Sequence, residues 1–174
     1  MVHFSTISEP APVSTPAPAV SSPAVLPPDQ LTARPGLDLL KDMIAGKVPG
    51  PPIAQTLNFT LVEVENGQVV FEGEPQFAFY NPLGTVHGGW TATLLDSAMA
   101  CAVHSTLAAG QGYTTLEFKL NCVRPITKDT GLVRCEGKVI NVGRTIATSE
   151  GRLIDSKGRL LAHGTETCLI FSAK

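Results

Sequence analysis

Hydrophobic and polar residues follow three different patterns along this chain of 174 residues. Between Gly36 and Gly46, apolar residues fall at helical spacing, which predicts a short amphipathic helix. From residue 88 to about residue 107, small and apolar residues occupy every face, and a helix of that kind is normally buried on all sides. In 53–73 and in 114–171, apolar and polar residues alternate, as in strands with one face in the core.

Turn signals divide the alternating regions into about six strands. Asn66-Gly67 predicts a type I′ hairpin after a strand at 53–65, since this turn needs positive φ at both central residues. Further turns are expected around Gly143 and Gly158. One buried helix among antiparallel strands is an α+β arrangement, and a sheet of that width can wrap the helix.

The first 35 residues have a different composition. They hold more than half of the 14 prolines, many alanines and serines, and few charges. Such a segment buries too little apolar surface to offset its ordering entropy. We therefore expect an extended or disordered tail at 1–35, with docking to a partner as the alternative, and one folded domain at 36–174.

Composition excludes several classes of protein. The formal net charge is −2, which argues against a nucleic-acid binder. No apolar run reaches the length of about 18 residues that a membrane span needs, and the N-terminus has no signal-peptide pattern. The four cysteines are too far apart in sequence for a CxxC motif, so a metal site is not expected. Together these features favour a cytoplasmic protein.

Asp96 stands out within the predicted buried helix. Between His87 and His104, the only other ionisable side chain is Cys101. A carboxylate in such a helix is costly unless it is paired, hydrogen-bonded or directed into a cavity. A capping role suits the start of a helix better than a position about two turns inside it. We therefore favour a functional role for Asp96.

The segment before this helix carries further candidates. Gly88-Gly89 opens the helix, where free N–H groups suit a carbonyl oxygen that becomes negative during attack. The amide of Asn81 can orient a water or a thioester oxygen, but an Asn-Pro turn explains it equally well. His87 is either a base or an anchor for the loop.

In these residues the chain resembles the hotdog-fold thioesterases of the phenylacetate-degradation (PaaI-like) type. The resemblance covers roughly residues 50–171. It is carried mainly by Asn81-Pro82-Leu83-Gly84-Thr85-Val86-His87-Gly88-Gly89 and Leu94-Leu95-Asp96. Support comes from Thr115-Leu116-Glu117-Phe118-Lys119, Val123-Arg124-Pro125, Gly143-Arg144 and Ala162-His163-Gly164-Thr165.

The resemblance implies a hotdog fold and hydrolysis of an acyl-CoA thioester. Asp96 is then the nucleophile or the general base toward water, and the Gly88 N–H polarises the thioester carbonyl. Asn81 positions the water or the acyl group, and His87 supports that geometry. Thr115 supplies a hydroxyl that orients water or the carboxylate.

The resemblance also implies how substrate and subunits are arranged. Gly89 belongs with the substrate-binding residues, and Arg144 meets the phosphates of CoA at the pocket mouth. The active sites form within a homodimer, with Asp96 facing the His87–Gly88 loop of the other chain, and dimers pair into homotetramers. No metal and no cofactor are expected, since coenzyme A is part of the substrate.

Two alternatives stay open at this stage. A hotdog dehydratase acting on a hydroxyacyl thioester needs a histidine paired with a carboxylate, and the predicted helix holds no second acidic residue. A non-catalytic acyl-CoA binding protein would keep the pocket without turnover. The acyl group is also open, with aryl-acetyl, hydroxybenzoyl and medium-chain groups all compatible.

Overall fold

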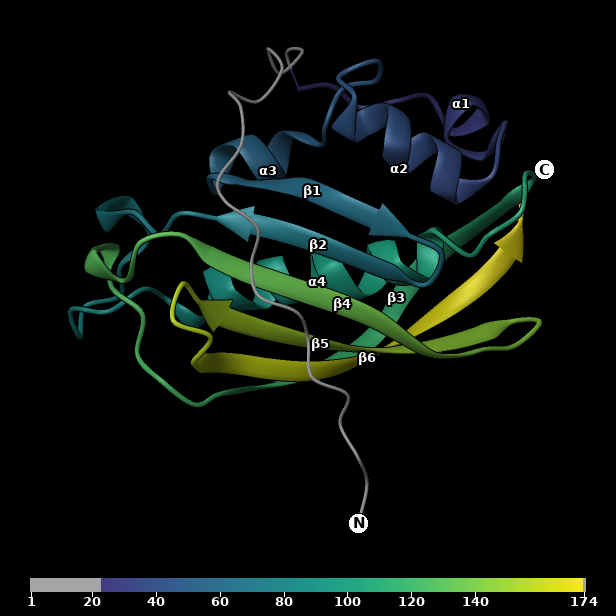
Figure 1. Ribbon diagram of the computed structural model, residues 1–174. Coiled ribbons are helices and arrows are strands. Elements are labelled where there is room, and N and C mark those ends of the chain that lie inside the picture. The colour runs from purple at the N-terminus through teal and green to yellow at the C-terminus, as the bar shows by residue number, and fades with distance from the viewer. Residues whose placement is uncertain (1–22, 174) are drawn as a thin grey trace.

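One long helix packs against a six-stranded antiparallel sheet in the computed structural model, which describes residues 23–173 (Figure 1). The order of strands across the sheet is β1-β2-β4-β5-β6-β3. The strands are β1 (Phe59–Glu65), β2 (Gln68–Gly73), β3 (Gln111–Cys122), β4 (Val133–Val142), β5 (Ile146–Asp155) and β6 (Leu160–Ser172). The α+β arrangement predicted from the residue pattern is confirmed.

The long helix, α4 (Gly88–His104), lies in the concave side of the sheet. Leu94, Leu95 and Met99 are fully buried, and burying each side chain contributes about 1.5–3 kcal/mol. The contact is close enough to require glycine in the sheet. A Cβ at Gly137 of β4 would lie 2.1 Å from the backbone oxygen of Ala98. Helix and sheet therefore hold the side chains of α4 in fixed positions.

The N-terminal part of the described chain is folded, which corrects part of our expectation. Residues 28–32 form α1 (Pro28–Thr32), and α2 (Gly36–Ile44) follows as predicted. Proline is well suited to the first turn of a helix, where its missing N–H has no partner to lose. The expectation of an extended or disordered tail is thus wrong for this part of 1–35. Residues 1–22 lie outside the described residues, and the domain boundary at 35 stays a prediction.

Two local expectations also need correction. Residues 53–56, predicted as strand, belong to α3 (Pro52–Thr56), again with proline in the first turn. The hairpin between β1 and β2 forms, but of its two turn residues only Gly67 has positive φ, so its turn is not type I′. Phe118 is 40% exposed on β3. Short 3-10 helices, η1 (Phe77–Phe79) and η2 (Lys128–Thr130), occur in the loops.

The strand β3 lies at one end of the sheet. It pairs with β6 along one side only, and its side chains are largely exposed. The register shifts at Leu116, which is an extra residue between the pairs Thr115–Cys168 and Glu117–Thr167. No helix within 23–173 has the length and hydropathy of a segment that crosses a bilayer.

Candidate active site

Asp96 lies in the middle of α4 and is half-buried. Its carboxylate oxygen Oδ1 lies 3.2 Å from the hydroxyl oxygen of Thr115. Desolvation by burial raises the pKa of Asp96, and the hydrogen bond from Thr115 opposes that shift. A carboxylate with a raised pKa is a stronger proton acceptor than an exposed one. The structure thus places the predicted carboxylate beside the predicted hydroxyl.

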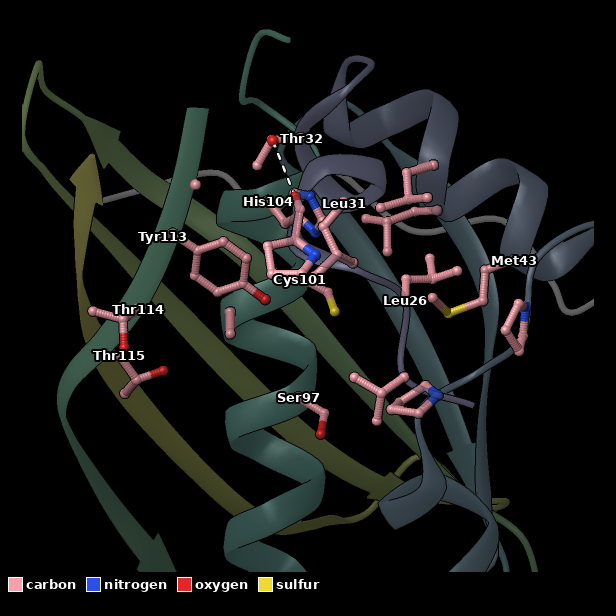
Figure 2. Close-up of a pocket in the computed structure, with 18 of the residues that line it drawn as sticks. Leu26, Leu31, Thr32, Met43, Ser97, Cys101, His104, Tyr113, Thr114 and Thr115 are labelled. Carbon is pink, nitrogen blue, oxygen red and sulfur yellow. Dashed lines mark hydrogen bonds between the residues drawn. The ribbon is translucent and has the colours of Figure 1, made fainter. Parts of the chain in front are cut away.

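The position of Thr115 depends on the irregularity in β3. The extra residue at Leu116 directly follows it, and such bulges re-aim side chains and are common beside active sites. Tyr113 and Thr114, directly before it on the strand, line the same cavity as Thr115 and Asp96. The strand therefore directs Thr115 at α4 (Figure 2).

The sequence analysis missed Glu166 on β6. Its side chain is 1% exposed, and its Oε1 lies 2.8 Å from Thr115 Oγ1 and 3.1 Å from Cys168 Sγ. Its other oxygen, Oε2, has no hydrogen-bond partner among the described residues. Burial raises the pKa of Glu166 to about 7. One signal was available: Glu166 shares the inward-facing parity of Ala162 and Cys168 along a strand.

Thr115 lies between two carboxyl groups but has one hydroxyl proton. It can donate that proton to Asp96 or to Glu166, not to both. Both contacts are satisfied when Glu166 keeps its own proton and donates it to Thr115, which then donates to Asp96. The raised pKa of Glu166 agrees with this direction, because the protonated acid is the form that burial favours.

The loop before α4 is organised by backbone and side-chain bonds. His87 is the N-cap, and its Nδ1 accepts a hydrogen bond of 2.8 Å from the Gly89 N–H. Gly88 is the first helical residue and is exposed, and its N–H has no acceptor inside the helix. His87 thus anchors the loop and occupies the Gly89 donor, while the Gly88 donor faces outward.

Asn81 holds the shape of the loop that precedes His87. Its Oδ1 accepts hydrogen bonds from the N–H groups of Leu83 and Thr85, at 2.9 and 3.3 Å, and its Nδ2 donates to Thr85 Oγ1 at 3.0 Å. These bonds match the turn interpretation of Asn81. A catalytic role for Asn81 stays a prediction.

The structure does not bring all the predicted residues together in one chain. Gly88 and Asp96 are eight positions apart on the same helix, which corresponds to about 12 Å along its axis. A single thioester carbonyl cannot reach both groups at that separation. Arg144 is exposed between β4 and β5. The described part of one chain therefore unites Asp96 with Thr115 and Glu166 only.

Comparison with known proteins places this geometry in a family. The model of the thioesterase superfamily matches residues 83–162, which include the His87–Gly89 loop, Asp96 and Thr115. Human acyl-coenzyme A thioesterase 13 is 30% identical over 109 residues, which cover 62% of this chain and 76% of that enzyme. The chain belongs to the thioesterase superfamily.

Other relatives agree with this assignment. A Ralstonia eutropha protein, whose solved structure is described as a thioesterase and as phenylacetic acid degradation-related, is 32% identical with a TM-score of 0.68, and the match covers 75% of this chain and 98% of that one. The match to a Caenorhabditis elegans protein named as an esterase is 34% identical and spans 61% of this chain and 62% of that protein. The predicted hotdog fold and PaaI-like relationship are confirmed.

Membership in the thioesterase superfamily confirms the predicted enzyme class, a thioester hydrolase. It does not assign individual residues. Catalytic roles therefore stay predictions for Asp96, Thr115, Gly88, Asn81 and His87.

Proposed function

We propose that this member of the thioesterase superfamily hydrolyses an aryl- or medium-chain acyl-CoA to the free acid and CoA. One observation carries the proposal: the half-buried carboxylate of Asp96, hydrogen-bonded to Thr115, lines a cavity of about 1000 Å³. That volume lies at the upper end of the range of about 300–1,000 Å³ for ligand sites. This position beside a cavity supports a role for Asp96 in attack on a bound thioester.

In the general-base route, Asp96 accepts a proton from water while the water oxygen bonds to the thioester carbon. The carbonyl oxygen becomes negative and is stabilised by the Gly88 N–H. The C–S bond then breaks, and the departing thiolate takes the proton from Asp96. Desolvation raises the pKa of Asp96 and so favours the first step of this route, the proton transfer from water to Asp96. Thr115 keeps the carboxylate oriented.

A nucleophilic route uses the same groups. Here an Asp96 oxygen bonds to the thioester carbon, the thiolate leaves, and water hydrolyses the resulting mixed anhydride. A single turnover in ¹⁸O-labelled water tests for the nucleophilic route. Label in the side chain of Asp96 indicates the anhydride, because only attack of water on the Asp96 carbon of that intermediate puts it there, whereas label in the released acid is common to both routes.

The proposal includes a homodimer with shared active sites. Gly88 lies about 12 Å along α4 from Asp96, so a second chain must supply the N–H. The edge strand β3 offers a surface for pairing, since Leu116 and Phe118 on the strand and Val123 directly after it are 54%, 40% and 46% exposed. Pairing of two dimers into a homotetramer, in a cytoplasmic setting, completes this part of the proposal.

Subunit mixing tests the shared site. Asp96→Asn removes the carboxylate, and Gly88→Pro removes the N–H at a helix position that tolerates proline. Each variant alone is expected to be inactive. Each mixed dimer holds one intact site of two, and about half of the dimers in an equal mixture are mixed, so about a quarter of wild-type activity is expected to return. No recovery in dimers shown to be mixed would contradict the sharing of the site.

The remaining predicted contacts concern the substrate. Arg144 would meet the phosphates of CoA through charge-assisted hydrogen bonds, and Gly89 would keep the loop narrow beside the thioester. Asn81 would position the water or the acyl group. His87 would hold the loop in place, in agreement with its hydrogen bond from the Gly89 N–H. The proposed reaction requires no cofactor and no metal, since carboxylate, water and N–H donor suffice.

Product analysis distinguishes the proposed hydrolysis from its alternatives. Purified protein is incubated with aryl- and alkyl-CoA esters, and both free thiol and enoyl-CoA are measured. Release of free thiol together with the free acid supports a thioesterase. Formation of enoyl-CoA from a hydroxyacyl-CoA indicates a dehydratase, and tight binding without any product indicates a binding protein.

A further inference from the structure

The cavity beside Asp96 has one wall made by α4. Asp96, Ala100 and His104 recur every four residues and so lie along one face of the helix, with Ser97 and Cys101 beside them. From Asp96 to His104 this face extends about 12 Å. The Asp96 carboxylate and His104 therefore mark the two ends of this helical wall.

The opposite wall comes from the N-terminal part of the chain. Figure 2 shows Leu26, Leu31 and Met43 across the cavity from Ser97, Cys101 and His104. These three apolar side chains are half-buried. We call residues 24–43, which contain α1 and all of α2 except its last residue, the roof of the cavity.

The roof is fixed to the domain at several points. The Ala24 N–H donates to the Gly50 carbonyl at 3.3 Å, the Gly110 N–H to the Thr32 carbonyl at 2.8 Å, and the Gly36 N–H to the Leu107 carbonyl at 3.0 Å. At Gly36 the contact is so close that a Cβ would lie 1.9 Å from the backbone oxygen of His104. The roof is thus seated on the end of α4 and forms part of the cavity wall.

The far half of the cavity suits a hydrocarbon. Leu31, Cys101 and Tyr113 are mainly apolar, and burial lowers the pKa of His104, so that its imidazole is neutral at neutral pH. Asp29 and Gln111 also border the cavity. An extended alkyl chain covers about 1.2 Å per bond, taken from an extended peptide residue, which spans about 3.6 Å over three backbone bonds. A length of about 12 Å therefore accepts about ten bonds.

We infer that residues 24–43 roof an acyl chamber for an unbranched alkyl group of about ten carbons, whose far end lies between Leu31 and His104. This inference rests on the proposed function, since the thioester carbonyl must lie at Asp96. The roof thus determines acyl-chain length. A single aromatic ring at Asp96 would reach only part of the way along α4 to His104.

Substitution of Leu31 tests this role of the roof. Leu31→Trp shortens the chamber at its far end, and Leu31→Ala lengthens it. The exposed Ala33, also in the roof but not bordering the cavity, provides the control Ala33→Trp. For each protein, kcat/KM is measured for a series of saturated acyl-CoA esters from butyryl to palmitoyl, and for phenylacetyl-CoA.

The wild type is expected to prefer decanoyl-CoA and its neighbours to both butyryl- and phenylacetyl-CoA. Each methylene excluded from an apolar site weakens binding about fourfold, so Leu31→Trp should lower the ratio of decanoyl to butyryl activity by about ten- to a hundredfold. Leu31→Ala should shift the optimum to longer chains, and Ala33→Trp should leave the wild-type profile in place.

Failure of the proposed function and failure of the inferred role of the roof give different results. If the wild type hydrolyses none of the esters, the proposed function is contradicted. If the wild type is active but both Leu31 variants keep the wild-type chain-length profile, or if phenylacetyl-CoA is the preferred ester, the roof does not determine the acyl group. Because the two Leu31 variants shift the profile in opposite directions, general damage to the fold cannot imitate the expected result.

Discussion

Replacing Glu166 with glutamine should change how the stability of the protein depends on pH. The carboxyl is 1% exposed, and burial raises its pKa from 4.5 to about 7. Between these pH values the folded protein keeps the Glu166 proton, whereas the unfolded chain has lost it. The free energy of unfolding therefore decreases as pH rises, because the folded state binds one proton more.

The size of the effect follows from the shift. Each unit of pKa corresponds to about 1.36 kcal/mol, so the protonated Glu166 contributes about 3 kcal/mol to the free energy of unfolding. This contribution is fully present below about pH 4.5 and is lost once the pH exceeds about 7. Glutamine has no proton to lose in this range. The Glu166→Gln variant should thus gain stability relative to the wild type by about 3 kcal/mol between pH 4.5 and pH 7.5.

Urea unfolding of both proteins at several pH values measures this difference. Comparing the two curves removes the titration of all other groups, apart from their coupling to Glu166. Glu150→Gln, on an exposed position of β5, controls for the loss of one carboxylate. Two curves that run parallel from pH 4.5 to pH 7.5 would refute the assignment of a proton to the buried Glu166.

Two further substitutions test the donor at the start of α4 and the packing behind it. Gly88→Pro removes the proposed N–H donor at the first helical position, while Gly88→Ala keeps the donor, and its new Cβ meets no atom within 4 Å. In the thiol-release assay, kcat of the proline variant should fall by about 10²–10³-fold, and kcat of the alanine variant should change little. Equal kcat values would exclude the N–H as a donor. Gly137→Ala should lower the free energy of unfolding by about 3 kcal/mol, because the added Cβ meets the backbone of Ala98. The control Gly50→Ala, with open space around the added Cβ, should lower it little in the same urea titration. Equal stability of the two variants would mean that α4 can move away from the sheet.

The residue pattern predicts the centre of the fold because few arrangements satisfy it. A helix apolar on every face needs cover on all sides, and alternating strands provide it. Asp96 was identified in the same way, since a carboxylate inside such a helix is costly unless it is paired, hydrogen-bonded or directed into a cavity. Thr115 was identified through family resemblance alone, because its place beside Asp96 depends on a bulge at Leu116 that alternation does not predict.

The parts that the sequence did not predict depend on contacts between distant segments. The composition of the tail indicated disorder, but Leu26 and Leu31 lie over α4, and three backbone hydrogen bonds hold the roof that contains them. Glu166 was not predicted as a site residue because a lone glutamate on a strand is usually exposed. Its burial depends on the position of β6 between β5 and β3, and the local residue pattern does not predict which strands pair.

The most direct test of the account is the rate of thiol release by the Asp96→Asn variant, measured beside the wild type and the exposed control Asp38→Asn. Asparagine keeps the shape of the side chain and can still bond to Thr115, but it cannot accept a proton or attack a thioester. We expect kcat to fall by about 10²–10⁴-fold in Asp96→Asn, with acyl-CoA binding and fold retained, and to stay at the wild-type value in Asp38→Asn. An Asp96→Asn enzyme with wild-type kcat would contradict the central claim.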